Sequence, residues 1–310
     1  MKTSLFFAAL LSFAAPALAA DAPQAPNRFV AAQPAASERF EIQGMLVERH
    51  GSGPRSLILV PGLASGGWVW GQMVRDLAPN HTVYVVTLPG FDGRPAVAGD
   101  PFDAARAALA ELIAARKLAR PVVVGHSIGA TLALALAQEQ PGRIGGVVAI
   151  DGLPVFPRTE DMPLDQRPAM AEAMRARMAA LSGPAFAAQQ QQYMRSIGMV
   201  DMGRADDAAR LTARSDPAAA AAYMGAALSR DLRPGLDRIK APVLLLVPYY
   251  APDAPALNDM TVGDKLAYYR ELMAGTPRLE VEPVDRARHF AMIDQPEAVV
   301  EAVRRFLKRL

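Results

Sequence analysis

The chain of 310 residues is long enough to bury a full hydrophobic core, either as one large domain with an insertion or as two modest domains. Apolar residues make up 51% and charged residues 21%, which is ordinary for a globular protein and excludes a disordered chain. The net charge of +2 gives no reason to expect nucleic acid as a partner. The chain has no cysteine, which excludes disulfides and a lipid anchor on cysteine.

Residues 1–20 have the pattern of a secretory signal peptide. Lys2 precedes an apolar stretch that ends in the small-residue cleavage pattern Ala17-Leu18-Ala19. This stretch is too short for a membrane anchor, so we expect cleavage, no stable membrane insertion afterwards, and a periplasmic or secreted protein. Residues 21–37 are rich in proline and alanine and predict a flexible lead-in.

Strand-like and helical segments alternate along the rest of the chain. Continuous apolar runs, typical of strands buried on both faces, recur between helical patterns. The predicted strands span 40–48, 56–62, 82–90, 121–127, 145–151, 242–248 and 278–284. Such alternation predicts an α/β fold, with a mostly parallel sheet and helices on both faces.

One long interval lacks any strand-like run. Residues 153–238 are helical in pattern and predict a cap inserted over the sheet, which leaves 38–152 and 239–310 as the α/β core. Met170, Met174 and Met178 recur at four-residue spacing in this interval. They would pack the helix that carries them, although methionine is also adaptable enough to line a pocket for apolar groups.

A serine lies at the junction of a predicted strand and a predicted helix, in "VVVGHSIGATLALALA". Ser127 is flanked by Gly125 and Gly129, which matches the G-x-S-x-G nucleophile elbow. In that turn the hydroxyl is raised above the carboxyl edge of the sheet, and glycines avoid collisions with the neighbouring strand and helix. The β-branched run before the serine and the alanines after it provide the strand–turn–helix context that the motif requires.

A serine nucleophile needs a base, and the four histidines can be compared by position. His50 and His81 lie at the end and the start of strands. His126 adjoins Ser127, and its side chain is expected to point away from the serine. His289 follows the last predicted strand, on a loop at the same edge as Ser127, so it is the predicted base.

The base needs a carboxylate to orient it, and two aspartates are candidates. Asp151 ends the strand before the cap, whereas Asp253 lies on a proline-rich loop after the strand at 242–248. Asp151 is favoured because a strand end is rigid, with Asp253 as the alternative acid and Asp259 as a remote third.

The oxyanion of the tetrahedral intermediate requires preorganised N–H donors. One is expected from Ile128, the residue after the nucleophile. The other is expected from Leu63, which follows Gly62 in the loop "PGLASGGW".

Together these motifs resemble the α/β-hydrolase superfamily, in particular esterase- and lipase-like serine hydrolases with a helical cap. The similar segments, in family order, are "LVPGLASGGWVW", "TLPGFDG", "VVVGHSIGA", "VVAIDGLP", "IKAPVLLLV" and "ARHFAMIDQPEAVVEAVRRFL". The resemblance implies an eight-stranded sheet, a Ser-Asp-His triad, no cofactor or metal, and substrates with an acyl bond. The chain departs from the family at Pro61, where a histidine is common, at Thr87, where an acid is common, and in the displaced post-strand aspartate.

The resulting hypothesis is a serine hydrolase that cleaves a carboxylic ester through an acyl-enzyme. The methionine and leucine content of the cap favours a small or medium apolar acyl or alcohol group. Other members of the same fold cleave carbon–carbon, lactone or N-terminal peptide bonds, and a hydrolase of that kind is an alternative. Haloalkane dehalogenases are also similar, but they use a carboxylate where this chain has Ser127. A non-catalytic ligand-binding protein is the alternative from a different class, and the fold alone does not name the substrate.

Overall fold

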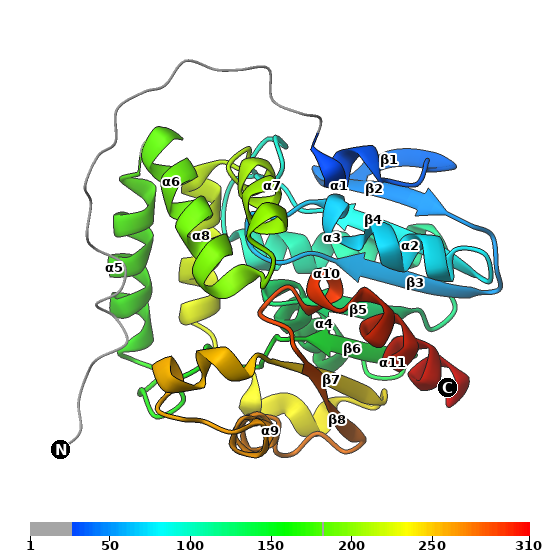
Figure 1. The fold of residues 1–310 in the computed structure, drawn as a ribbon. Coiled ribbons are helices and arrows are strands. Elements are labelled where there is room, and N and C mark those ends of the chain that lie inside the picture. The colour runs from blue at the N-terminus through cyan, green and yellow to red at the C-terminus, as the bar shows by residue number, and fades with distance from the viewer. Residues whose placement is uncertain (1–26, 182) are drawn as a thin grey trace.

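A sheet of eight strands runs through the protein in the order β1-β2-β4-β3-β5-β6-β7-β8 (Figure 1). The computed structural model describes residues 27–181 and 183–310, so the predicted signal peptide and residues 21–26 lie outside the described residues. The strands are β1 (Glu38–Ile42), β2 (Met45–His50), β3 (Arg55–Val60), β4 (His81–Thr87), β5 (Val122–His126), β6 (Gly146–Ile150), β7 (Val243–Tyr249) and β8 (Leu279–Asp285). The prediction of an α/β fold with a mostly parallel sheet of eight strands is confirmed.

Helices connect the strands from β3 onward. The α-helices are α1 (Arg28–Ala31), α2 (Gly71–Leu77), α3 (Pro101–Ala115), α4 (Ile128–Glu139), α5 (Arg167–Ala179), α6 (Gly183–Tyr193), α7 (Met202–Thr212), α8 (Pro217–Leu228), α9 (Val262–Leu272), α10 (Ala291–Asp294) and α11 (Pro296–Lys308). Short 3₁₀ helices span Gly67–Trp70, Arg233–Arg238 and Ala251–Leu257, and a π-helical turn spans Met194–Gly198.

The first predicted strand, residues 40–48, is in fact a hairpin. β1 and β2 pair antiparallel, and the chain reverses at Gln43 and Gly44, whose φ angles are 47° and 78°. Positive φ at both central residues is typical of the tight turn that matches the twist of a two-stranded hairpin. The alternation of side chains continues on both sides of this turn, which is why the segment looks like one strand.

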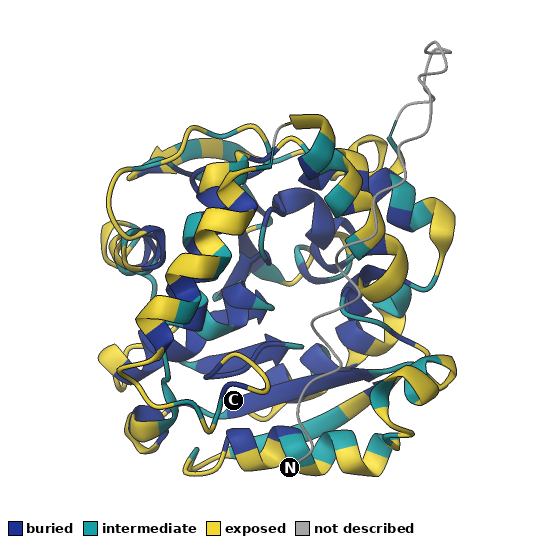
Figure 2. Ribbon diagram, turned by 90° about the vertical axis from the view of Figure 1, so that its left-hand side faces the viewer, coloured by how far each residue is buried: buried dark blue, intermediate teal, exposed yellow. Residues whose placement is uncertain are grey.

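The remaining six strands, β3 to β8, are mutually parallel, so the loops after β3, β5, β6 and β8 leave the sheet at one edge. Each central strand is buried on both faces (Figure 2). In β3, Ile58 and Val60 belong to one hydrophobic cluster, whereas Leu57 and Leu59 belong to the other. This period of two divides the core into two layers.

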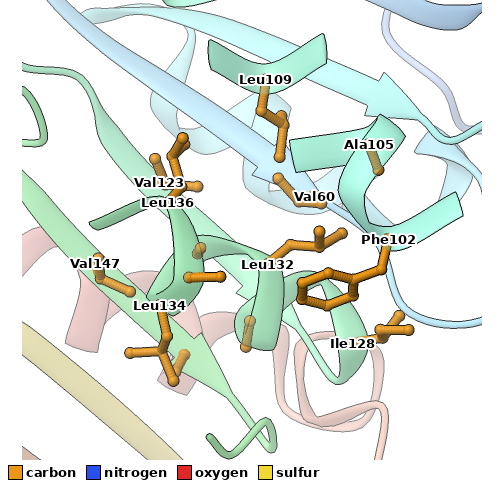
Figure 3. Packing of buried hydrophobic residues seen from close by; sticks show 14 of the residues in the cluster. Val60, Phe102, Ala105, Leu109, Val123, Ile128, Leu132, Leu134, Leu136 and Val147 are labelled. Atoms are coloured by element: carbon orange, nitrogen blue, oxygen red, sulfur yellow. The ribbon is translucent and has the colours of Figure 1, made fainter. Parts of the chain in front are cut away.

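Helices α3 and α4 cover the first layer, and α2 and α11 cover the second. Figure 3 shows how the sheet packs against the helices in the first layer, with Val60 of β3 facing Leu109 of α3 and Leu132 of α4. Small side chains such as Ala133 and Ala137 are fully buried on α4, so this helix lies close to the sheet. The packing holds the first turn of α4, and the serine before it, in a fixed position.

Helices α5 to α8 are inserted between β6 and β7 and stand together beside the sheet, at the left of Figure 1. We call α5 to α8, with the π turn that joins α6 to α7, the cap. Among the described residues, no helix has both the length and the apolar character needed to cross a bilayer.

From Asn27 onward, the segment expected to be a flexible lead-in is instead held against the rest of the protein. The Asn27 side chain donates to Asp207 O at 2.7 Å, and Arg28 forms an ion pair with the Asp207 carboxylate on α7. The ring of Phe29 lies 5.3 Å from that of Trp68. Composition predicted flexibility, but these anchors on the cap and on the first 3₁₀ helix order the segment.

Candidate active site

Ser127 occupies a sharp turn between β5 and α4. Its φ of 52° and ψ of −123° lie outside the regions that a serine ordinarily adopts. Its N–H donates to Ile150 O at 3.0 Å, which ties the turn to β6. A Cβ at Gly125 would lie 2.3 Å from Gly129 O, and one at Gly129 would lie 2.3 Å from Val60 O. Only glycine fits at either position, so the two glycines make this strained geometry possible.

Asp151 and His289 form a hydrogen-bonded pair at the same edge of the sheet. His289 Nδ1 lies 2.6 Å from Asp151 Oδ2, and the Tyr269 hydroxyl donates to Asp151 Oδ1 at 2.5 Å. Burial acts to raise the pKa of Asp151, but the Lys265 charge and the two hydrogen bonds outweigh it and hold that pKa well below its usual range. Asp151 therefore stays an anion and a hydrogen-bond acceptor for the imidazole.

His289 reaches the edge on the loop between β8 and α10 and lies next to the Ser127 turn. The ring of His126, the residue before Ser127, is centred 4.5 Å from the ring of His289. Ser127 and His289 are both half-buried. Among the described residues, neither the Ser127 hydroxyl nor His289 Nε2 has a hydrogen-bond partner, so both groups remain available to a substrate and to each other.

The loop after β3 lies against the serine. A Cβ at Gly62 would come within 3.2 Å of Ser127 Cβ, so the backbone that leads to Leu63 passes directly beside Ser127. Within the described part of the chain, Leu63 N–H donates no hydrogen bond. Ile128 is the first residue of α4, where the N–H has no partner within the helix. Both predicted oxyanion donors thus lie in segments next to the serine.

The structure does not bring the alternative acids to the histidine. Asp253 instead binds Arg288, with Arg288 Nε to Oδ2 at 2.8 Å and Nη2 to Oδ1 at 2.6 Å. Asp259 lies just after the 3₁₀ helix Ala251–Leu257, which carries Asp253, and its N–H donates to Ala254 O. A proline-rich loop can place its carboxylate in several directions, and here the neighbouring arginine attracts it.

The other two histidines lie far from this edge. His50 pairs with Val83 near the start of β4, and His81 begins that strand, so both sit at the opposite end of the sheet. Among the described residues, no group of three histidine, aspartate or glutamate side chains is arranged to hold a metal ion.

Comparison with known proteins places these observations in a family. Residues 57–302 match the sequence profile described as the alpha/beta hydrolase family. The chain belongs to the alpha/beta hydrolase family. The match begins in β3 and ends in α11, so it includes the serine turn, the cap and the histidine loop.

Named relatives of this α/β hydrolase include methyl ester esterases. The pimeloyl-[acyl-carrier protein] methyl ester esterase of Aeromonas salmonicida is 32% identical over 117 residues, which are 38% of this chain and 45% of that protein. The match therefore spans less than half the length of that relative. A protein of the same name from Xanthomonas campestris pv. campestris is 28% identical over 278 residues, 86% of this chain and all of its own.

Solved structures share the fold at lower identity. A thermophilic esterase from Thermogutta terrifontis superposes with a TM-score of 0.67 at 21% identity, covering 88% of this chain and 99% of that one. An enol-lactonase from Burkholderia xenovorans LB400 superposes with a TM-score of 0.60 at 20% identity, covering 87% and 100%. At this identity the likeness shows the fold alone.

Three residues of this α/β hydrolase contact the site without having been predicted from the sequence. Tyr269 and Lys265, both on α9, stabilise the Asp151 anion. Tyr193, at the end of α6, presents its ring to His289 at 6.2 Å and nearly edge-on. A tyrosine or a lysine on a surface helix carries no local mark of such a role, and no motif in these segments could have revealed it.

The ring of His126, which was not a candidate base, supports the histidine loop. Its Nε2–H donates to His289 O at 3.0 Å. Burial, together with the nearby His289, holds the pKa of His126 well below its usual range, so this ring stays neutral. The ring fills the space between Gly62 and His289. A Cβ at Gly62 would lie only 2.6 Å from His126 Nδ1, so there is no room for a side chain at that position.

Proposed function

We propose that this protein is a serine esterase in which Ser127, His289 and Asp151 form the catalytic triad. The observation that carries the proposal is the bond of 2.6 Å between His289 Nδ1 and Asp151, made beside the strained turn of Ser127. The bond directs Nε2, the other ring nitrogen, away from Asp151 and leaves it to accept a proton.

In the first half of the reaction, Ser127 Oγ attacks the acyl carbon of the ester and its proton passes to His289 Nε2. The imidazolium is stabilised by the Asp151 anion, and the N–H groups of Leu63 and Ile128 donate to the oxyanion. When the intermediate collapses, the carbon–oxygen bond to the alcohol breaks, and His289 returns the proton to the leaving oxygen.

In the second half, a water molecule replaces the alcohol. His289 takes a proton from the water as the hydroxide oxygen bonds to the acyl carbon. The second intermediate then releases a carboxylic acid, and Ser127 recovers its proton. The pKa of Asp151 lies below its usual range, so this carboxylate stays ionised at neutral pH, as the mechanism requires.

The proposed substrate is a small or medium ester with an apolar acyl or alcohol group. Methyl ester esterases among the relatives support an ester with a small alcohol. The accessible residues of the site agree with an apolar group: Leu63, in the loop beside Ser127, and Tyr193, beside His289, are half-buried, and Ile197, which binds the His289 N–H, is 54% exposed.

The direct test is hydrolysis of p-nitrophenyl esters from acetate to octanoate, with Ser127→Ala alongside. We expect kcat of the variant to fall by about 10³-fold or more. The variant should also no longer be labelled by a fluorophosphonate probe. Asp151→Asn should cost about 10⁴-fold in kcat, whereas Asp253→Asn should cost less than about tenfold. Full turnover by Ser127→Ala, or the reverse order of the two aspartate variants, would overturn the assignment.

We further propose that residues 1–20 direct export and are then removed, so that the enzyme works in the periplasm or outside the cell. Support comes from the basic start, the apolar stretch and the small residues at Ala17-Leu18-Ala19. Mass spectrometry of the protein from the periplasmic fraction should show a chain that begins near Ala20 or Asp21. An intact N-terminus in a cytoplasmic fraction would contradict this.

A further inference from the structure

The loop that carries His289 is attached to the cap by its main chain. His289 N–H donates to Ile197 O at 3.2 Å, and Phe290 N–H donates to Gly198 O at 2.9 Å. Both acceptors belong to the π turn between α6 and α7. The backbone of the proposed base is therefore bonded to the cap on its N–H side, while His126 binds its carbonyl from the core.

The π-turn geometry makes these acceptors available. Met199 N–H donates to Met194 O at 2.9 Å, five residues back, so the turn is one residue wider than an α-helical turn. Carbonyl groups in such a turn are not all used within the helix. Those of Arg195, Ile197 and Gly198 accept from the histidine loop, as does that of Met199, the residue directly after the turn. Turns of this kind are rare and often occur at functional sites.

Arg288, the residue before His289, joins three segments. Its Nη1 donates to Arg195 O at 2.8 Å and to Met199 O at 3.1 Å in the cap. Its Nε and Nη2 bind the Asp253 carboxylate on the loop after β7. The Arg288 side chain is 16% exposed and that of Asp253 is 28% exposed, so the pair is partly shielded from water. A planar guanidinium with several donors suits this arrangement, which lysine could satisfy only in part.

Asp294, at the end of α10, also links the histidine loop to the cap. Its carboxylate accepts from Arg288 N–H at 2.9 Å and from Val200 N–H at 3.0 Å. The cap segment 195–200 and the loop 288–294 are thus held together by several main-chain and side-chain hydrogen bonds.

We propose that the π turn of the cap is a positioning element for His289, held in place by Arg288 and Asp253. The cap at this point is part of the active site and does not lift away as a lid. Arg288 and Asp253 act through the position of His289 and do not touch the reacting atoms. The catalytic consequence rests on the proposed esterase function, whereas the attachment itself does not.

The expected effect is on the chemical step. Displacing a catalytic group by about 1 Å can cost about 100-fold in rate. Arg288→Met keeps a side chain of similar length but removes four side-chain hydrogen bonds. It should lower kcat and the rate of fluorophosphonate labelling by about 10- to 100-fold, and KM should stay within about threefold of wild type. Arg288→Lys should recover part of the loss, and Asp253→Asn, which keeps an acceptor oxygen, should lose less than about tenfold.

The matched control is Arg175→Met, which removes an exposed arginine of the cap whose ion-pair partner, among the described residues, is Glu172 on its own helix. It should behave as wild type in every assay. Hydrogen–deuterium exchange gives a readout that needs no activity: peptides covering 194–200 and 288–294 should exchange faster in Arg288→Met and not in Arg175→Met.

A native kcat in a folded Arg288→Met, or unchanged exchange of these two segments, would overturn the proposal. If Arg288→Met fails to fold, exchange in Asp253→Asn decides: faster exchange of the two segments supports the proposal, and unchanged exchange overturns it. A wild-type protein that neither hydrolyses esters nor reacts with the probe would instead refute the esterase function, and the exchange data would still test the attachment.

Discussion

Replacing Tyr269 with phenylalanine removes one oxygen atom from the surroundings of Asp151. The Tyr269 hydroxyl donates to Asp151 Oδ1 at 2.5 Å, and the tyrosine is 7% exposed, so water cannot easily take the place of the lost donor. Asp151 Oδ2 keeps its bond to His289. The variant therefore tests how much the second hydrogen bond to the Asp151 carboxylate contributes to stability and to catalysis.

The expected loss can be estimated from the type of bond. A hydrogen bond to a charged group contributes about 1.5–3 kcal/mol, so we expect the free energy of unfolding at pH 7 to fall by about 2 kcal/mol. The carboxylate also becomes freer to rotate away from the imidazole, which lowers the population of the productive geometry. We expect kcat/KM for a p-nitrophenyl ester to fall by about three- to thirtyfold.

The pH dependence has a definite sign. The pKa of Asp151 is lowered from its ordinary value of 3.8, so its ionic bonds stabilise the fold above that pH and lose their effect as pH falls through the folded-state pKa. Loss of the phenol raises that pKa. Urea unfolding should therefore show a constant difference in stability between wild type and Tyr269→Phe from pH 8 down to about pH 4. The difference should narrow only at lower pH, as the Asp151 carboxylate is protonated in the folded state.

Tyr268→Phe is the control, because the Tyr268 hydroxyl donates to Glu160 Oε1 and accepts from Arg158 N, away from Asp151. It should keep wild-type kcat/KM and lose less than about 1 kcal/mol of stability. Equal losses of activity in the two variants, or a Tyr269→Phe protein with unchanged kcat/KM, would refute the role given to this hydroxyl.

Three further predictions concern His126, Gly62 and Asp92. His126→Phe keeps the ring but removes the donor to His289 O, so kcat/KM should fall about tenfold, whereas His126→Gln, which keeps a donor, should lose less; equal losses would contradict this. Gly62→Ala places a Cβ 2.6 Å from His126 Nδ1 and should displace the oxyanion loop, lowering kcat by about 10²- to 10³-fold in steady-state assays. Burial raises the pKa of Asp92 to about 6, so its ionisation costs stability as pH rises from about 4 to above 6. Asp92→Asn should then be more stable than wild type by about 2 kcal/mol at pH 8, with no advantage at pH 4, by urea unfolding.

Local patterns in the sequence were sufficient for the α/β fold and for the geometry around Ser127. Continuous apolar runs such as "SLILV" and "VVVG" can be buried only between two layers of helices, and this requirement is local. The serine turn is local as well, because only glycine at Gly125 and Gly129 leaves room for the neighbouring main chain. The edge on which His289 lies follows from the direction of parallel strands.

Only the tertiary structure decided which side chains meet across segments distant in the chain. The sequence left Asp151 and Asp253 as alternatives, and the choice came from Arg288, which holds Asp253, and from Tyr269, which holds Asp151. The orientation of a side chain on a loop depends on partners contributed by other elements, and hydrophobic periodicity carries no record of them. The support that His126 and the π turn give to His289 belongs to the same class of fact, since each hydrogen bond joins residues more than 85 positions apart.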